Sequence, residues 1–208
     1  MLTPEPINGA LRDHAASRQD WEHRGLVQEL HAWAKRFDDR FGLELQTPAI
    51  RVERLRVNVL GSYRNGRNGL GVQHEVTIND RWFDKPRAEL LETVFHELLH
   101  LWQRLHGKPG KRNYHNAEFR KKAASYGLVV DARGCTVQVQ QGPFTKLLEE
   151  HGVDTGPLLE DDKDEQRPEG TSTQNKWSCA CTNVRAAVEL EMQCLRCGQR
   201  LKRAKAAW

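Results

Sequence analysis

The fold of this chain depends on one stretch, residues 87–107, which reads RAELLETVFHELLHLWQRLHG. Pro86 stands where a helix can begin and Gly107 where one can end, so the stretch predicts a single long helix. Leucine, valine and phenylalanine occupy most of its sides, which predicts burial. Within it His96, Glu97 and His100 form the pattern His-Glu-x-x-His. Such polar groups are costly in a buried helix unless they have a partner.

The spacing of these residues predicts a metal site. Two imidazoles four residues apart project from one face of a helix about one turn apart, so they can bind a single Zn²⁺. Glu97 lies beside them, where its carboxylate reaches a water molecule rather than the ion, as a general base requires. A chain of this composition contains about 0.03 such motifs by chance. We therefore expect a catalytic zinc with His96 and His100 as ligands and Glu97 as catalytic base.

A catalytic zinc needs a third protein ligand, and the residues leave three candidates. His106 follows His96 by ten residues, as in elongated motifs that turn the chain at a glycine, but this chain has Gln103 there. On a straight helix His106 then points away from the pair. Glu118 and His115 both lie at the start of a second predicted helix. Spacing alone does not separate these two.

Working outward from the central helix, the flanking patterns predict an α+β fold. Residues 20–41 have aromatic residues at helical spacing and a helix-ending Gly42. Residues 50–60 and 72–79 alternate as strands, and the Asn-Gly pairs between them predict a hairpin in a small antiparallel sheet. A second helix, 116–127, begins at a capping Asn116, and the strand-like CTVQVQQ at 135–141 ends the body. The expected order is helix, sheet, His-Glu-x-x-His helix and second metal-ligand helix.

Four of the five cysteines form two close pairs, Cys179-x-Cys181 and Cys194-x-x-Cys197, twelve residues apart. Four thiolates at such spacing are typical of a structural zinc ribbon with tetrahedral Cys₄ coordination. A tail this short has little core of its own, so the metal is expected to supply its folding free energy. Cys135 stands apart and is expected to be a small buried residue.

The charges divide the chain into segments. The 208 residues carry a net charge of +4, but residues 151–170 carry −5 and residues 171–208 carry +5. We predict a domain over 1–150, an acidic flexible linker over 151–175 and the Cys₄ ribbon with a basic tail over 176–208. No stretch has the roughly 18 apolar residues of a membrane span, and the N-terminus lacks an apolar signal core. Paired cysteines without such a signal predict the reducing cytoplasm.

These motifs resemble the SprT/Spartan family of zinc metalloproteases. The resemblance covers HELLH at 96–100, YHNAEF at 114–119, the preceding LGSYRNGRNG…VTIN segment and the C-terminal ribbon, although Asn116 replaces a usual glycine. It implies a compact zincin-like fold with zinc on His96, His100 and His115. Glu97 would then be the general base, and Glu118 would support the site without binding the metal.

The resemblance also implies a function. We expect a zinc endopeptidase with one catalytic and one structural Zn²⁺, which cleaves proteins bound or crosslinked to DNA. Nucleic acid, preferably single-stranded, would position the enzyme through an aromatic and basic surface on the ribbon. The residues expected to form this surface are Trp177, Arg185, Arg196, Arg200, Lys202 and Arg203. Two alternatives remain: a silent, zinc-stabilised nucleic-acid-binding adaptor, and a regulatory protease with one dedicated protein substrate.

Overall fold

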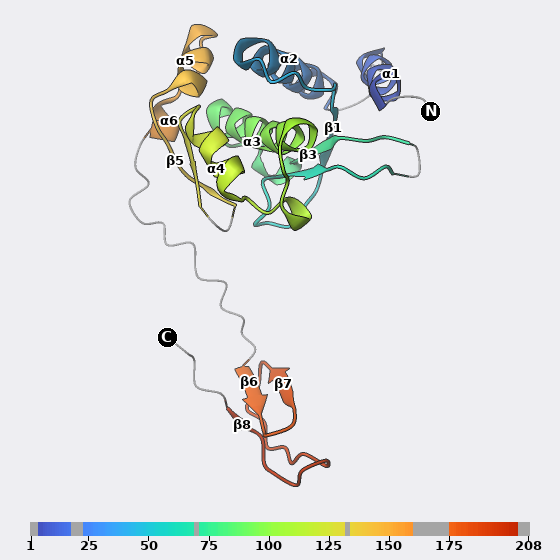
Figure 1. The fold of residues 1–208 in the computed structure, drawn as a ribbon, viewed down its shortest axis with the longest axis vertical. Coiled ribbons are helices and arrows are strands. Elements are labelled where there is room, and N and C mark those ends of the chain that lie inside the picture. Colours follow the sequence, from blue (N-terminus) through green and yellow to red (C-terminus); the bar gives the residue numbers. More distant parts are fainter. Residues whose placement is uncertain (1–3, 18–22, 69–70, 132–133, 160–174, 204–208) are drawn as a thin grey trace. The chain divides into compact units, whose positions relative to one another are not determined.

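The computed structural model describes residues 4–17, 23–68, 71–131, 134–159 and 175–203 (Figure 1). The chain divides into two compact units, Met1–Asp161 and Asp162–Trp208. The α+β class expected from the sequence is confirmed, because both units combine short strands with helices or turns. Among the described residues, no helix has the length and apolar character needed to cross a membrane.

Helix α3 (Arg87–His106) is the centre of the first unit. Every residue from Leu90 to Leu101 is buried, polar residues included. Helix α2 (Arg24–Phe41) packs on it, and strands β2 and β3 of a small sheet contact another of its sides (Figure 1). Helix α2 ends at Gly42, which adopts the left-handed conformation as expected. Because α3 is enclosed on several sides, its polar residues face one another rather than solvent.

The sheet is mixed, with the order β1-β3-β2 (Ala49–Glu53, Glu75–Asn79 and Gly61–Arg64). Strand β3 pairs in parallel with β1 and antiparallel with β2. The expectation of one continuous strand over 50–60 in a purely antiparallel sheet is therefore wrong. The reason is Asn79, which is fully buried and whose side chain bonds the backbone of Leu55, Arg56 and Val59. These bonds fold residues 54–60 into a loop between two separate strands.

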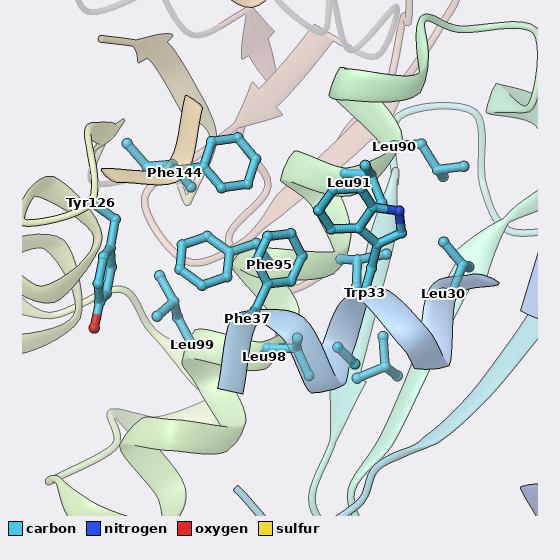
Figure 2. Packing of buried hydrophobic residues seen from close by; sticks show 14 of the residues in the cluster. Leu30, Trp33, Phe37, Leu90, Leu91, Phe95, Leu98, Leu99, Tyr126 and Phe144 are labelled. Atoms are coloured by element: carbon cyan, nitrogen blue, oxygen red, sulfur yellow. The ribbon is translucent and has the colours of Figure 1, made fainter. Parts of the chain in front are cut away.

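An aromatic cluster joins the helices into one core (Figure 2). The Phe95 ring of α3 lies 4.8 Å from that of Phe37 on α2 and 5.3 Å from that of Phe144 on α5 (Pro143–Glu150). Tyr126 closes one side, with its ring 5.2 Å from Phe95. Offset aromatic contacts of this kind each contribute about 0.5–1.5 kcal/mol beyond the area they bury. The cluster therefore holds α3, and with it the His-Glu-x-x-His residues, in a fixed position.

The remaining elements of this unit are short, apart from the 14-residue first helix. They are α1 (Pro4–Ser17), the 3₁₀ turns η1 (Asp80–Trp82) and η2 (Lys111–Asn113), α4 (Ala117–Ala124), the hairpin β4 (Leu128–Val130) with β5 (Thr136–Val139), and α6 (Gly156–Leu159). The sequence patterns did not indicate α1, α5 or α6. Asn116 caps α4 as expected, since its side chain accepts a hydrogen bond from Phe119 N.

The segment predicted as a linker begins with folded residues. The Thr155 hydroxyl is buried and donates to Glu149 of α5, and Leu158 of α6 packs against the core. Residues 151–159 are therefore attached to the first unit rather than solvated throughout. Residues 160–174 of the predicted linker lie outside the described residues.

The second unit is a three-stranded sheet in the order β7-β6-β8 (Asn183–Ala186, Asn175–Ser178 and Lys202–Arg203). Strand β6 is antiparallel to both neighbours. The buried core of this second unit consists of Trp177, Cys194 and Leu201. Three side chains form a very small core, so this unit needs another source of stability.

Candidate metal centre

Three histidine side chains meet at one point of the first unit. His96 and His100 come from α3, and His115 comes from the segment just before α4. The Nε2 atom of His115 lies 2.8 Å from His96 Nε2 and 2.9 Å from His100 Nε2. The structure thus brings together the three histidines that the family resemblance implies.

The imidazoles are held in place by the rings around them. The His100 ring stacks on Phe119 of α4 with the ring centroids 4.3 Å apart, and Tyr63 of β2 lies parallel to it on another side. The His115 ring meets the same Phe119 edge-on at 4.6 Å. Phe119 is fully buried. The His96 ring lies 5.1 Å from it as well, so one apolar side chain contacts all three imidazoles.

Glu118 and His106, the other candidate ligands, are engaged elsewhere. The Glu118 carboxylate accepts hydrogen bonds from Lys108 N and from Gln103 Nε2, at 2.7 Å each, and these bonds hold its pKa below the usual range. His106 Nε2 lies 3.0 Å from the carbonyl oxygen of Glu44, at the far end of α3. Neither belongs to the histidine cluster.

Gln103 links the segments that carry the histidines, and the sequence patterns did not indicate it. It is 1% exposed, and its amide donates to Asn116 Oδ1 at 2.8 Å as well as to Glu118. Asn116 in turn donates to the carbonyl oxygen of Lys108. This network ties the last turn of α3 to the first turn of α4, and so sets the position of His115. The available signal was a polar residue in the apolar helix at the position where elongated motifs turn.

The histidines are in the protonation state that metal ligands need. Burial lowers the pKa of His96 to about 3, with a further contribution from His115. Burial also lowers the pKa of His100, to about 2, and that of His115. All three imidazoles are therefore neutral at pH 7, the form in which histidine binds a metal.

Glu97 has the opposite shift. It is 8% exposed, and burial followed by the nearby Glu92 raises its pKa to about 8, against a hydrogen bond from the backbone of Tyr63. A carboxylate with a raised pKa takes up a proton more readily near neutral pH. A bound divalent cation would oppose the shift by favouring the charged form.

The donor set fits zinc. Tetrahedral Zn–N bonds of about 2.1 Å place nitrogen ligands about 3.4 Å apart. The Nε2 atom of His115 lies 2.8 Å and 2.9 Å from those of His96 and His100, which is about half an ångström closer than that spacing. Three neutral imidazoles leave a fourth position free, which is the arrangement of catalytic sites.

Three side chains near the histidine cluster could donate a hydrogen bond to an oxyanion, and they lie in different surroundings. The Tyr63 hydroxyl is buried and lies 2.8 Å from His74 Nδ1, so it is already bonded. Tyr114, next to His115, is 52% exposed. Arg112 adopts a left-handed backbone conformation in the same loop.

The four paired cysteines form a second possible metal group in the second unit. Adjacent sulfur atoms lie 3.8 Å apart for Cys179 and Cys181, 3.4 Å for Cys181 and Cys194, and 3.6 Å for Cys179 and Cys197. Tetrahedral Zn–S bonds of about 2.3 Å require sulfur spacings of about 3.8 Å, so this group also fits zinc. Backbone hydrogen bonds from Cys197 and Arg196 lower the pKa of Cys194 to about 6, which favours the thiolate. Cys135 is outside the group and half-buried.

The residues expected to contact nucleic acid do not share one environment. Trp177 is 5% exposed and packs with Cys194 and Leu201, because so small a unit needs a large side chain inside. The expectation that its ring forms a stacking face is therefore wrong. The five cations of the expected surface are exposed: Arg185, Arg196, Arg200, Lys202 and Arg203.

Two of these cations share a face with a third. Strand pairing places Lys176 opposite Arg185, and Ser178 opposite Lys202. Paired residues and residues two apart lie on the same side of a sheet, so Lys176, Arg185 and Lys202 form one basic face, opposite Trp177. Arg200 pairs with Glu191 at 3.7 Å, and Arg203 donates to Asn175.

Comparison with known proteins agrees with this geometry. The model of the SprT-like family matches residues 27–141, which is more than half of the chain and includes most of α2, the mixed sheet, α3, α4 and the hairpin β4–β5. No curated protein and no solved structure matched. With its three converging histidines on the matched segment, this chain belongs to the SprT-like family.

Proposed function

We propose that this protein is a zinc-dependent endopeptidase. The observation that carries the proposal is the convergence of three neutral imidazoles beside the buried carboxyl group of Glu97, with His115 Nε2 lying 2.8 Å from His96 Nε2 and 2.9 Å from His100 Nε2. A site that only stabilises the fold has no need of a base at this position. Membership of the SprT-like family supports the same reading.

His96, His100 and His115 would hold the zinc ion. When bound, Zn²⁺ supplies polarisation of the scissile carbonyl and acidification of a water molecule. Glu97 accepts the proton of the attacking water on its carboxylate and then donates it to the nitrogen of the leaving amine. Its burial on α3 excludes bulk water that would otherwise compete for that proton. Tyr114, exposed beside His115, is the candidate donor to the developing oxyanion.

We further propose that the substrates are proteins bound to or crosslinked to DNA. In this proposal a structural zinc stabilises the Cys₄ unit, and the basic face of that unit binds the DNA. Three cations on one face of a small sheet suit the phosphate backbone of a single strand. Free cysteines, four of them grouped at the spacing of a zinc site, suit the reducing cytoplasm.

The test is cleavage of a DNA-binding protein by the full chain loaded with zinc, with and without single-stranded DNA. Glu97→Gln keeps the size and hydrogen bonding of the side chain but removes the base, and we expect it to lower kcat by about 10²–10⁴-fold. Glu89→Gln is the matched control, since Glu89 lies two turns earlier on α3 and pairs with Lys85 at the surface. It should retain full activity.

Each outcome has a distinct meaning. Cleavage that needs both Glu97 and DNA supports the whole proposal. Cleavage that needs Glu97 but not DNA supports the peptidase with a dedicated protein substrate and overturns the DNA part. Equal cleavage by Glu97→Gln overturns the mechanism. DNA binding without cleavage in any reaction favours a nucleic-acid-binding adaptor.

A further inference from the structure

We propose that Glu92 and Thr136 are positioning residues that orient His96 through a chain of hydrogen bonds from one side of the metal centre. The inference rests on the proposed metal site, but it concerns two residues that neither the motif nor the sequence patterns assign to it. Glu92 lies on α3 one turn before His96, and Thr136 is the first residue of β5.

The contacts form a continuous path. The Thr136 hydroxyl donates a hydrogen bond to Glu92 Oε1. The same hydroxyl oxygen lies 3.4 Å from His96 Nδ1. The opposite ring atom, His96 Nε2, is the one that faces His115. The path therefore runs from a carboxyl group through a hydroxyl and an imidazole to the point where the three histidines meet.

The positions of the hydrogens on His96 Nδ1 and on the Thr136 hydroxyl follow from this path. An imidazole that binds a metal through Nε2 carries its hydrogen on Nδ1, and this N–H points at Thr136 Oγ1. A hydroxyl that accepts there donates its own hydrogen elsewhere, and Glu92 Oε1 is the acceptor. The chain of bonds thus selects the Nδ1–H tautomer of His96, which leaves the Nε2 lone pair directed at the metal.

The burial of Glu92 is difficult to explain without such a role. Glu92 is 8% exposed on a helix whose buried residues are mostly apolar, and its carboxyl group accepts the hydrogen bond from Thr136. A buried carboxyl group without a cationic partner reduces stability. A leucine at this position would pack without that cost. Glu92 lies one turn before His96 and is hydrogen-bonded to Thr136, which contacts the His96 ring. A role in orienting His96 therefore explains why a carboxyl group is buried here.

The hairpin β4–β5 supports the same side of the site. Gly134, two residues before Thr136, lies against the His115 ring so closely that a Cβ atom there would overlap Cε1 and Nδ1 of the imidazole. The hairpin therefore touches two of the three histidines, His96 through Thr136 and His115 through Gly134. The hairpin β4–β5, which the sequence places at the end of the first domain, thus packs against the metal centre.

The test measures metal affinity, which does not depend on peptidase activity. The full chain is stripped of metal and titrated with Co²⁺ against a competing chelator. The thiolate charge-transfer absorption of the Cys₄ group separates its binding from that of the histidine site. Thr136→Val removes the hydroxyl at nearly constant volume, and Thr136→Ser keeps it. Val137→Thr, at the exposed neighbouring position on β5, is the control for disturbance of the strand.

We expect Thr136→Val to weaken Co²⁺ binding at the histidine site by about 10–100-fold and to change its d–d absorption, while the Cys₄ site is unaffected. Thr136→Ser and Val137→Thr should bind as the wild type does, and Glu92→Leu should weaken binding as Thr136→Val does. Unchanged affinity and spectrum in Thr136→Val would overturn the inference, even if the variant melts at a lower temperature.

Failure of this inference is distinguishable from failure of the proposed function. If Thr136→Val weakens metal binding while the wild type cleaves nothing, the positioning role stands and the peptidase proposal falls. If the wild type cleaves in a Glu97-dependent way while Thr136→Val binds metal normally, the peptidase stands and the positioning role falls.

Discussion

At the scale of single residues, the metal centre depends on which side chains are already bonded. His115 and Glu118 both lie at the start of α4, but Glu118 accepts bonds from Lys108 N and Gln103, whereas His115 presents Nε2 to the other histidines. The two residues therefore have separable tasks. His115 completes the donor set, and Glu118 fastens the segment that carries it.

This division predicts different effects for two substitutions. His115→Ala should weaken zinc binding at the histidine site by about 100-fold or more, since it removes one of three ligands. Glu118→Ala should leave the affinity within a few-fold but lower the free energy of unfolding by about 1–3 kcal/mol, because Gln103 and Lys108 N lose their acceptor. Chelator competition measures the first quantity and urea unfolding the second. A large loss of affinity in Glu118→Ala alone would reverse the assignment.

A second residue-scale prediction concerns His31, on α2 away from the metal centre. Burial, followed by Arg12, lowers its pKa to about 4. The unfolded chain binds a proton at this residue below about pH 6.5, whereas the folded chain does so only near pH 4. The folded state is therefore favoured fully above pH 6.5, and this contribution is lost as the pH falls from 6.5 to 4.

His31→Gln should accordingly lose less stability over that range than the wild type does, by about 1–3 kcal/mol. Urea unfolding at pH 7 and pH 4.5 measures this difference. The other titrating groups are common to both proteins and cancel. Equal pH dependence in the two proteins would show that the imidazole of His31 is protonated as easily in the folded chain as in the unfolded one.

At the scale of elements, the metal centre lies between one helix and several segments that follow it. Helix α3 supplies two histidines and Glu97, the turn before α4 supplies His115, and the hairpin β4–β5 lies against His96 and His115. Phe144 of α5 packs on Phe95 and so stabilises the middle of α3 from the side (Figure 2). The geometry of the site therefore depends on elements that contribute no ligand.

Gly134 tests this dependence, with Gly152 as its matched control. Both adopt positive φ, 91° and 73°, where an alanine costs about 1–2 kcal/mol. A Cβ at Gly152 meets nothing within 4 Å, whereas one at Gly134 overlaps the His115 ring. We expect Gly152→Ala to lower stability only, and Gly134→Ala also to weaken zinc binding at the histidine site by about tenfold or more. Equal zinc affinity in the two variants would mean that the hairpin moves aside without effect on His115.

At the scale of the whole molecule, the two compact units rely on different sources of stability. The first has an extended aromatic and aliphatic core around α3. The second buries Trp177, Cys194 and Leu201 beside a group of four cysteines. Below about 40 residues, a fold usually needs a metal or disulfides, and this unit presents four thiols at the spacing of a zinc site.

Replacement of one of these thiols should therefore unfold one unit and leave the other intact. We expect Cys197→Ser to lower the zinc content from two ions per chain to one and to expose the β6–β8 region to protease, while residues 24–159 stay resistant. Cys135→Ser, outside both donor groups, is the control and should keep both ions. Atomic absorption and limited proteolysis measure these effects. A protected β6–β8 region in Cys197→Ser would show that the small core folds without the metal.

Much of this architecture follows from the sequence because it depends on local spacing. The pair His96 and His100 lies on one face of α3 through helical periodicity, and the two cysteine pairs have the spacing of a ribbon. The caps at Gly42 and Asn116 are likewise local, since each depends on the conformation or bonding of neighbouring residues. The class and the central helix could therefore be predicted from the residues alone.

The tertiary structure alone decided the features that depend on contacts between distant residues. The side chain of Asn79 bonds the loop that separates β1 from β2, where one strand was predicted. Trp177 is buried in the core of the second unit. Gln103 donates a hydrogen bond to Glu118, which therefore does not join the histidine cluster. Thr136 reaches His96 across 40 residues of chain. A hydrogen bond or a buried ring has no period along the sequence, because its partner is selected by how the elements pack and not by how far apart the residues are.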